Sequence, residues 1–219
     1  MSPFDIFDPS TVLDPTAFTG EAGATRLMQA AAHFPGGPMA LVFALFWAPV
    51  GPGIPAGVLL ARHLRIAPAV TFGLYALSDV LAVLLLNPIY SLLRTHGRRN
   101  ATIRRIGQRV LAVAMIGTRR PTVDEVRAGR LAPALFRIAT VGFGVDIYTA
   151  GALATGLPIP RLPGWAAAMV GDLIWFAVLL GSSIAAAQVF DERGIAVVVI
   201  AVTLLGPALA RRIFPSLRG

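Results

Sequence analysis

The chain has no lysine and no cysteine, and it has few charged residues of any kind. The absence of cysteine excludes a disulfide framework and thiol chemistry. Only three histidines occur, at positions 33, 63 and 96, and their scatter argues against a histidine metal site. Charged residues make up 14% of the 219 positions, against about 25% in soluble domains. So few polar groups cannot cover a soluble domain of this length, which favours an integral membrane protein of one domain.

Apolar residues make up more than half of the chain: 56% of the residues are hydrophobic, and the mean hydropathy is +0.72. Five apolar stretches approach the roughly 20 residues of a membrane span. A sixth, 110–117, is brief and follows several arginines. Since backbone groups in lipid must be satisfied within helices, we predict an all-α membrane protein with five or six membrane segments. The five longer stretches are 39–61, 67–93, 131–157, 164–189 and 194–210.

The positive charge is concentrated in one stretch. All 19 basic residues are arginine, and ten of them lie between Arg94 and Arg130 beside only two acids, Asp124 and Glu125, so this stretch carries the whole net charge of +8. Such a stretch is expected on the cytoplasmic side of a membrane. Its flanking apolar segments, and the lack of aromatic residues among the arginines, argue against a nucleic-acid partner.

Short sequence motifs from the first half of the chain recur in the second half at a nearly constant offset. Ala56-Gly57-x-Leu59 returns as Ala150-Gly151-x-Leu153, a shift of 94, and Asp79 returns as Asp172, a shift of 93. A third match joins 110–117 to 199–206. We predict two repeats, inverted in the membrane if each crosses an odd number of times, as in secondary transporters. The predicted division is a lead-in 1–38, repeat 1 at 39–118, a basic linker 119–130, repeat 2 at 131–214 and a tail 215–219.

Each predicted repeat begins with an interrupted helix. Residues 49–55 hold three prolines and two glycines, and 142–146 reads Gly-Phe-Gly-Val-Asp. Proline and glycine both weaken a helix, so we predict broken or re-entrant helices whose freed backbone groups face protein or water. Gly53, Pro55 and Gly144 are therefore candidates for lining a substrate or ion site. A plain structural kink is the alternative.

Three acids lie inside apolar stretches: Asp79, Asp146 and Asp172. An aspartate at mid-bilayer costs about 3 kcal/mol, so each must face another acid, a cavity or a partner. Two aspartates brought together by the repeat would share a proton near neutral pH or bind a cation. The alternative is that these acids cap helices or bond to backbone at the breaks.

Aromatic residues accompany these acids. Tyr148 and Trp175 flank Asp146 and Asp172 and are candidates for a substrate cavity, although Tyr75, Tyr148, Trp165 and Trp175 also fit interface belts. Asn87-Pro88 is predicted to end or bend the second helix.

Basic residues in the short loops are candidates for contacts with lipid headgroups, or for simple interface anchoring: Arg62, Arg65 and Arg161. No catalytic motif or phosphate loop is present, so we expect no enzyme activity, no catalytic residues, no cofactor and no metal.

Several short motifs together resemble the first and second halves of the small multi-drug export family. They are Gly53-Ile-Pro-Ala-Gly57, Ala67-Pro68, Ser78-Asp79, Asn87-Pro88, Tyr148-Thr-Ala-Gly-Ala-Leu153 and Gly171-Asp172. The layout is also similar to DedA-type proteins, and Gly171-Asp-Leu-Ile-Trp175 is similar to LysE-type exporters. The chain departs from these families in two places: the apolar residues 39–48 that lead into the first break include no acid, and Asp146 stands in the region of the second half where DedA-type proteins place an arginine.

The resemblance implies a transporter in a bacterial cytoplasmic membrane that exports small hydrophobic or cationic molecules and is coupled to protons or a cation. Two alternatives stay open. One is a DedA-like flippase for an anionic lipid carrier such as a polyprenyl phosphate, and the other is a non-transporting membrane scaffold. The expected partners are the lipid bilayer, the substrate and the coupling ion, and assembly into a homo-oligomer stays open as well.

Overall fold

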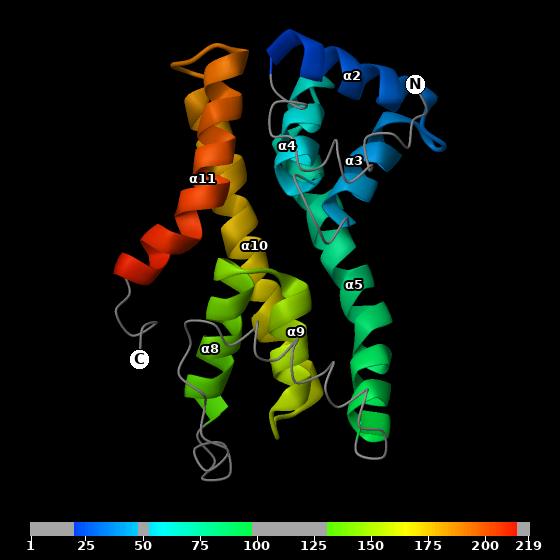
Figure 1. Cartoon of the computed structure of the whole chain (residues 1–219), viewed down its shortest axis with the longest axis vertical. Helices are drawn as coiled ribbons and strands as arrows, with labels where there is room; N and C mark the ends of the chain where they lie inside the picture. The colour runs from blue at the N-terminus through cyan, green and yellow to red at the C-terminus, as the bar shows by residue number, and fades with distance from the viewer. Residues whose placement is uncertain (1–19, 48–52, 98–130, 214–219) are drawn as a thin grey trace. The chain divides into compact units, whose positions relative to one another are not determined.

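The computed structural model describes residues 20–47, 53–97 and 131–213, and within them the chain forms helices and no strand (Figure 1). This confirms the predicted all-helical fold for the part of the chain that is described. The helices are α2 (Gly20–His33), α3 (Gly37–Trp47), α4 (Gly53–His63), α5 (Pro68–Gly97), α8 (Leu131–Gly144), α9 (Ile147–Gly156), α10 (Arg161–Ala186) and α11 (Glu192–Ile213).

Both predicted breaks separate two helices. The first lies between α3 and α4, and Pro55 falls in the first turn of α4, where the missing N–H of proline removes no helical hydrogen bond. The second lies between α8 and α9 at residues 145–146. Here Asp146 has extended backbone and caps α9, since its carboxylate accepts a hydrogen bond from the Thr149 N–H at 2.5 Å. The predicted spans 39–61 and 131–157 are thus pairs of short helices rather than single spans.

The order of helices recurs along the chain. Helices α3, α4 and α5 begin at residues 37, 53 and 68, and α8, α9 and α10 begin at 131, 147 and 161, so the offsets are 94, 94 and 93. These are the offsets of the first two sequence matches. In each set two short helices precede a long one. The segment 110–117, which carries the third match, lies outside the described residues.

The chain forms two compact units. Unit 1 comprises Met1–Ser78 and Phe176–Leu204, and unit 2 comprises Asp79–Trp175 and Leu205–Gly219. Helices α5, α10 and α11 each contribute residues to both units, so each unit combines parts of both sequence halves.

Unit 1 has an aromatic core. Tyr75 of α5 stacks on Phe176 of α10 with ring centroids 3.8 Å apart, and Phe46 of α3 meets both rings edge-on. Gly57 lies beneath the Phe46 ring, where a Cβ would come within 2.5 Å of a ring carbon. The glycine lets α4 approach α3 this closely, and helix α2 packs on both.

Unit 2 is built on close contacts between backbones. The α8 and α9 pair lies side by side (Figure 1). A Cβ at Gly171 of α10 would collide with the Ala139 carbonyl of α8, and one at Gly142 of α8 would collide with the Ala168 carbonyl of α10. Gly151 of α9 is covered by the Trp165 ring. Helix approach through small residues is typical of packing in membranes.

Of the two outcomes predicted for Asn87-Pro88, a helix end or a bend, the end is wrong, because helix α5 continues to Gly97. Contacts with α10 on either side of Pro88 stabilise this part of α5. The Asn87 side-chain oxygen accepts a hydrogen bond from Trp165 Nε1 at 3.2 Å, and the Tyr90 ring lies parallel to the Trp165 ring. The interface-belt interpretation is also wrong for Tyr75, Trp165 and Trp175, which are all buried.

Among the residues that the structure describes, two helices are long and apolar enough to cross a membrane. They are Pro68–Leu92 of α5, with mean hydropathy 2.0, and Arg161–Ala186 of α10, with mean hydropathy 1.8. Only 28% of the first window and 44% of the second are buried in the protein. Both helices therefore present apolar side chains outward. The outward residues on α5 include Leu77, Leu84, Leu85, Ile89 and Leu92, and those on α10 include Leu162, Val170, Ile174 and Val178.

Candidate functional site: a buried carboxyl pair

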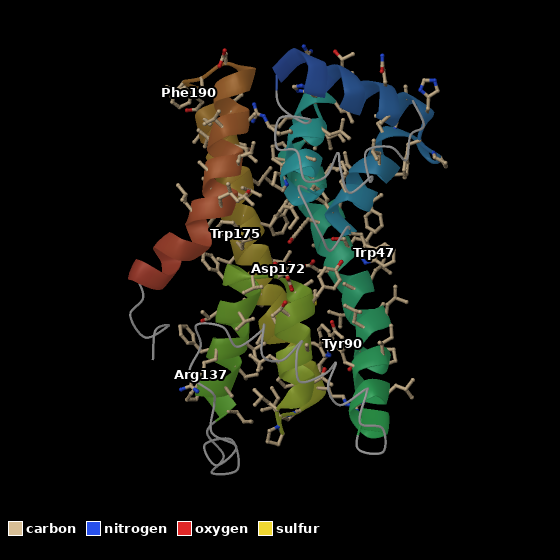
Figure 2. All side chains as sticks on the ribbon, in the orientation of Figure 1. Trp47, Tyr90, Arg137, Asp172, Trp175 and Phe190 are labelled. Atoms are coloured by element: carbon tan, nitrogen blue, oxygen red, sulfur yellow. The ribbon has the colours of Figure 1, made fainter. Side chains whose placement is uncertain are left out.

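Two of the three predicted acids meet in unit 2. Asp79 lies on α5 and Asp172 on α10, and their exposed fractions are 3% and 2%. The two carboxyl groups lie within side-chain hydrogen-bonding reach and in direct electrostatic contact. Figure 2 marks Asp172 on α10. The acids at matching positions of the predicted repeat are therefore neighbours in space.

One oxygen of this pair has no hydrogen-bond partner. Within the described residues, Asp79 Oδ2 is buried and accepts no hydrogen bond. Two carboxylates in contact repel each other strongly away from water, whereas a single shared proton turns the contact into an O–H···O hydrogen bond. The pair can therefore hold one proton, and its remaining oxygen can accept a second donor such as water or an ammonium group.

Tyr148 is the third member of the site. It lies in the first turn of α9 and is half-buried. Its phenol is within electrostatic range of Asp79, Asp146 and Asp172, as well as of Tyr90. Tyr148 thus lies within electrostatic range of all three predicted acids, and two of them, Asp79 and Asp172, are in contact with each other.

Asp146 differs from the other two acids in exposure and bonding. It is half-exposed, and it serves as the N-cap of α9 through its bond with Thr149. The helix-capping alternative therefore holds for Asp146. A capping carboxylate has a second oxygen, so the cap does not remove Asp146 from the electrostatic surroundings of Tyr148.

Tyr90 was missed in the sequence. Its hydroxyl donates a hydrogen bond to the Tyr148 backbone carbonyl at 3.2 Å, which ties α5 to the first turn of α9. A signal was present, because Tyr90 follows Asp79 by eleven residues, about three helical turns, and so lies on the same face of α5. The expectation of a helix end at Pro88 hid this relation.

The other predicted lining residues have different surroundings. Gly53 and Pro55 are buried at the start of α4 in unit 1. Gly144 ends α8, and a Cβ there would meet nothing within 4 Å. Trp175 packs edge-on against Phe143, with ring centroids 5.5 Å apart, and lies against Gly206, so its indole fills the core of unit 2.

The three loop arginines also differ from one another. Arg62 donates a hydrogen bond to the Ser183 carbonyl of α10 at 3.0 Å, within unit 1. Arg65 is exposed and has a positive φ of 54°, and Arg161 is exposed at the start of α10. The side chains of the arginine-rich stretch 94–130 lie outside the described residues.

No cluster of three or more His, Cys, Asp or Glu that could hold a metal occurs in the described parts of the chain. Figure 2 shows Arg137 on the outer side of α8.

Comparison of the chain with protein-family models, curated proteins and solved structures finds no match to any of them. The resemblance to small multi-drug exporters stays a prediction from its own motifs.

Proposed function

We propose that the protein is a small membrane transporter in which the Asp79–Asp172 pair binds and releases the coupling proton. One observation carries the proposal: two acids from matching positions of a repeat lie buried against each other, with one carboxyl oxygen unpartnered. Buried acids in apolar helices are costly, and in membrane proteins they mark ion and proton pathways.

The outer surfaces of α5 and α10 support a location in the membrane. A core helix of a soluble protein would be mostly buried, and α5 and α10 are not. A signal sequence lies near the N-terminus, whereas these helices begin at Pro68 and Arg161. Exposed leucine, isoleucine and valine along both helices are favourable only against an apolar medium such as lipid.

The recurrence of two short helices and a long one supports a duplicated, inverted transporter. Broken helices in secondary transporters surround the substrate and ion site near mid-membrane. In this proposal the pair alternates between a protonated form and a form that binds substrate. A cationic substrate displaces the shared proton into solution and takes its place beside the carboxylates, so one positive charge is exchanged for another. This mechanism is compatible with the hydrophobic or cationic substrates that the resemblance implies.

Proton displacement tests the proposal directly. The purified protein is placed in weakly buffered detergent solution with a pH dye, and the lipophilic cation tetraphenylphosphonium is added. The wild type should release about one proton per chain, because the pair shares one proton. Asp79→Asn and Asp172→Asn should release none.

Asp191→Asn is the matched control. Asp191 is an exposed acid whose carboxylate accepts a hydrogen bond from the Gly194 N–H, and asparagine can keep this bond. It should behave as the wild type. Equal release from all four proteins would show that the pair is not the proton site, and no release from any of them would favour the scaffold alternative.

Translocation of an anionic lipid has weaker support. It needs basic groups free for a phosphate, and Arg62 donates to the Ser183 backbone instead. Arg65 and Arg161 are the exposed candidates that remain in the described loops.

A further inference from the structure

The Asp79 Oδ2 atom is a buried acceptor to which the described part of the protein supplies no donor. Asp79 is 3% exposed, and none of the described side chains or backbone N–H groups donates a hydrogen bond to this oxygen. The residue before it in the chain, Ser78, donates its hydroxyl to the Tyr75 carbonyl at 2.7 Å. The nearest hydroxyl along the chain is therefore already engaged within its own helix.

Other side-chain donors of unit 2 are engaged as well. Trp165 Nε1 donates to the Asn87 side-chain oxygen, and the Tyr90 hydroxyl donates to the Tyr148 carbonyl. The buried Thr155 hydroxyl bonds within its own helix. Each of these polar groups has its partner inside the protein, so the donor that completes Asp79 has to come from a bound molecule.

The substrate-bound form needs such a donor most. A buried carboxylate oxygen without a donor costs far more free energy than one in water. Under the proposed function, a cation displaces the proton shared by Asp79 and Asp172, which are in contact. Loss of this proton also removes the O–H···O hydrogen bond between the two carboxyl groups. The cation then faces both the unpartnered Oδ2 atom and the oxygens that the proton had joined.

We propose that the substrate is a protonated amine whose N–H groups donate hydrogen bonds to Asp79 Oδ2 and to the oxygens that shared the proton. A primary ammonium group carries three N–H donors, whereas a quaternary ammonium group of the same charge carries none. No covalent bond of the substrate changes: the amine keeps its own protons, and the proton of the pair goes to solution. This substrate class rests on the proposed function of the pair.

Three cations that differ only in methylation test the preference. Benzylammonium, benzyldimethylammonium and benzyltrimethylammonium carry the same ring and one positive charge at neutral pH, with three, one and no N–H groups. Proton release is titrated with each chloride salt in the dye assay, after all solutions are adjusted to the same pH. The wild type should respond to benzylammonium at a concentration about tenfold or more below that of benzyltrimethylammonium, because the missing donors leave buried charged acceptors unpaired. Burial of the added methyl groups alone would give the opposite order.

Protection against thermal unfolding extends the test to variants that release no proton. Benzylammonium should raise the unfolding temperature of the wild type at lower concentrations than benzyltrimethylammonium, since a ligand that binds the folded form stabilises it. Asp79→Asn should lose this preference, because the side chain loses its charge and one of its two acceptor oxygens. The matched control Asp191→Asn changes an exposed acid and should keep the preference. If Asp79→Asn does not fold, the titrations of the wild type still decide.

The outcomes separate the substrate class from the proposed function. If the wild type releases no proton with any benzyl salt or with tetraphenylphosphonium, the proposed role of the pair fails. If protons are released but benzylammonium acts at the same concentration as benzyltrimethylammonium or at a higher one, the preference for an amine alone is wrong. Release by tetraphenylphosphonium but by no benzyl salt also overturns it. The same holds if Asp79→Asn keeps the wild-type preference, because the N–H groups would then be recognised elsewhere.

Discussion

The two units bury different kinds of polar side chain. In unit 1 the buried hydroxyls of Thr71, Ser78 and Ser183 each donate to a carbonyl three or four residues earlier in the chain, at 3.3, 2.7 and 2.7 Å, and the buried Thr155 hydroxyl of unit 2 does the same. Unit 2 also buries two acids, Asp79 and Asp172, which meet each other, and the Asp79 Oδ2 atom accepts no hydrogen bond from the part of the chain that the structure describes. Self-satisfied hydroxyls cost little in an apolar interior, whereas an incompletely bonded acid costs a great deal.

This difference is relevant to the proposed function. A polar group that is bonded within its own helix is complete without a ligand. The carboxyl pair is complete only with a proton or another donor. Under the proposed function, the acid pair places the proton site in unit 2, whereas the buried hydroxyls of unit 1 need no ligand.

The largest loss of stability is expected from a substitution at the close contact between the backbones of α8 and α10 in unit 2. In Gly171→Leu the new side chain would collide with the Ala139 carbonyl of α8, which cannot move aside as a side-chain tip would. We expect a destabilisation of about 3 kcal/mol or more, measured as loss of monodisperse protein after heating in detergent.

Gly181→Leu, on the same helix but in unit 1, is the matched control. A Cβ at Gly181 meets nothing within 4 Å, and the residue is exposed. This variant should remain as stable as the wild type. If both variants lost stability equally, the cause would be the insertion of leucine into α10 rather than the α8 contact.

A smaller loss of stability, combined with a loss of proton release in one variant only, is expected at Ser78 and Asp79, two neighbouring residues that belong to different units. Ser78→Ala removes a hydroxyl bonded to the Tyr75 carbonyl and should cost about 1 kcal/mol or less, with proton release unchanged. Asp79→Asn, one residue later, should abolish proton release while the protein stays folded. The comparison is made on the same preparation by thermal unfolding and by the pH dye. Loss of proton release in Ser78→Ala would erase the distinction between the two units.

Local features of the fold were predictable from the sequence. The helix breaks follow from proline and glycine, and the offset of 94 between the short-helix pairs follows from the repeat of Ala56-Gly57. The meeting of Asp79 and Asp172 was also foreseeable, since buried acids in matching positions of a repeat need a partner.

Features that depend on long-range contacts were not predictable. A proline at position 88 normally ends a helix, and only the partners of Asn87 and Tyr90 on other helices explain why α5 continues. The glycines that lie beneath aromatic rings are a second example. Gly57 and Gly151 match in the repeat, but the covering ring comes from α3 in one case and from α10 in the other. A pattern can predict that a position must be small without indicating what packs on it.

The smallest effect is expected in unit 1 at Arg62, whose predicted contact was a lipid headgroup. Arg62→Gln shortens the donor that reaches the Ser183 carbonyl and should cost about 0.5 kcal/mol of stability, because this hydrogen bond is only partly buried. The matched Arg65→Gln changes an exposed residue and should cost nothing measurable. Thermal unfolding is measured in neutral detergent with and without added anionic lipid. Because the Arg62 contact lies within the protein, its loss should be the same in both conditions. A loss of stability in Arg62→Gln that is seen only with anionic lipid would instead support the predicted contact of Arg62 with a lipid headgroup.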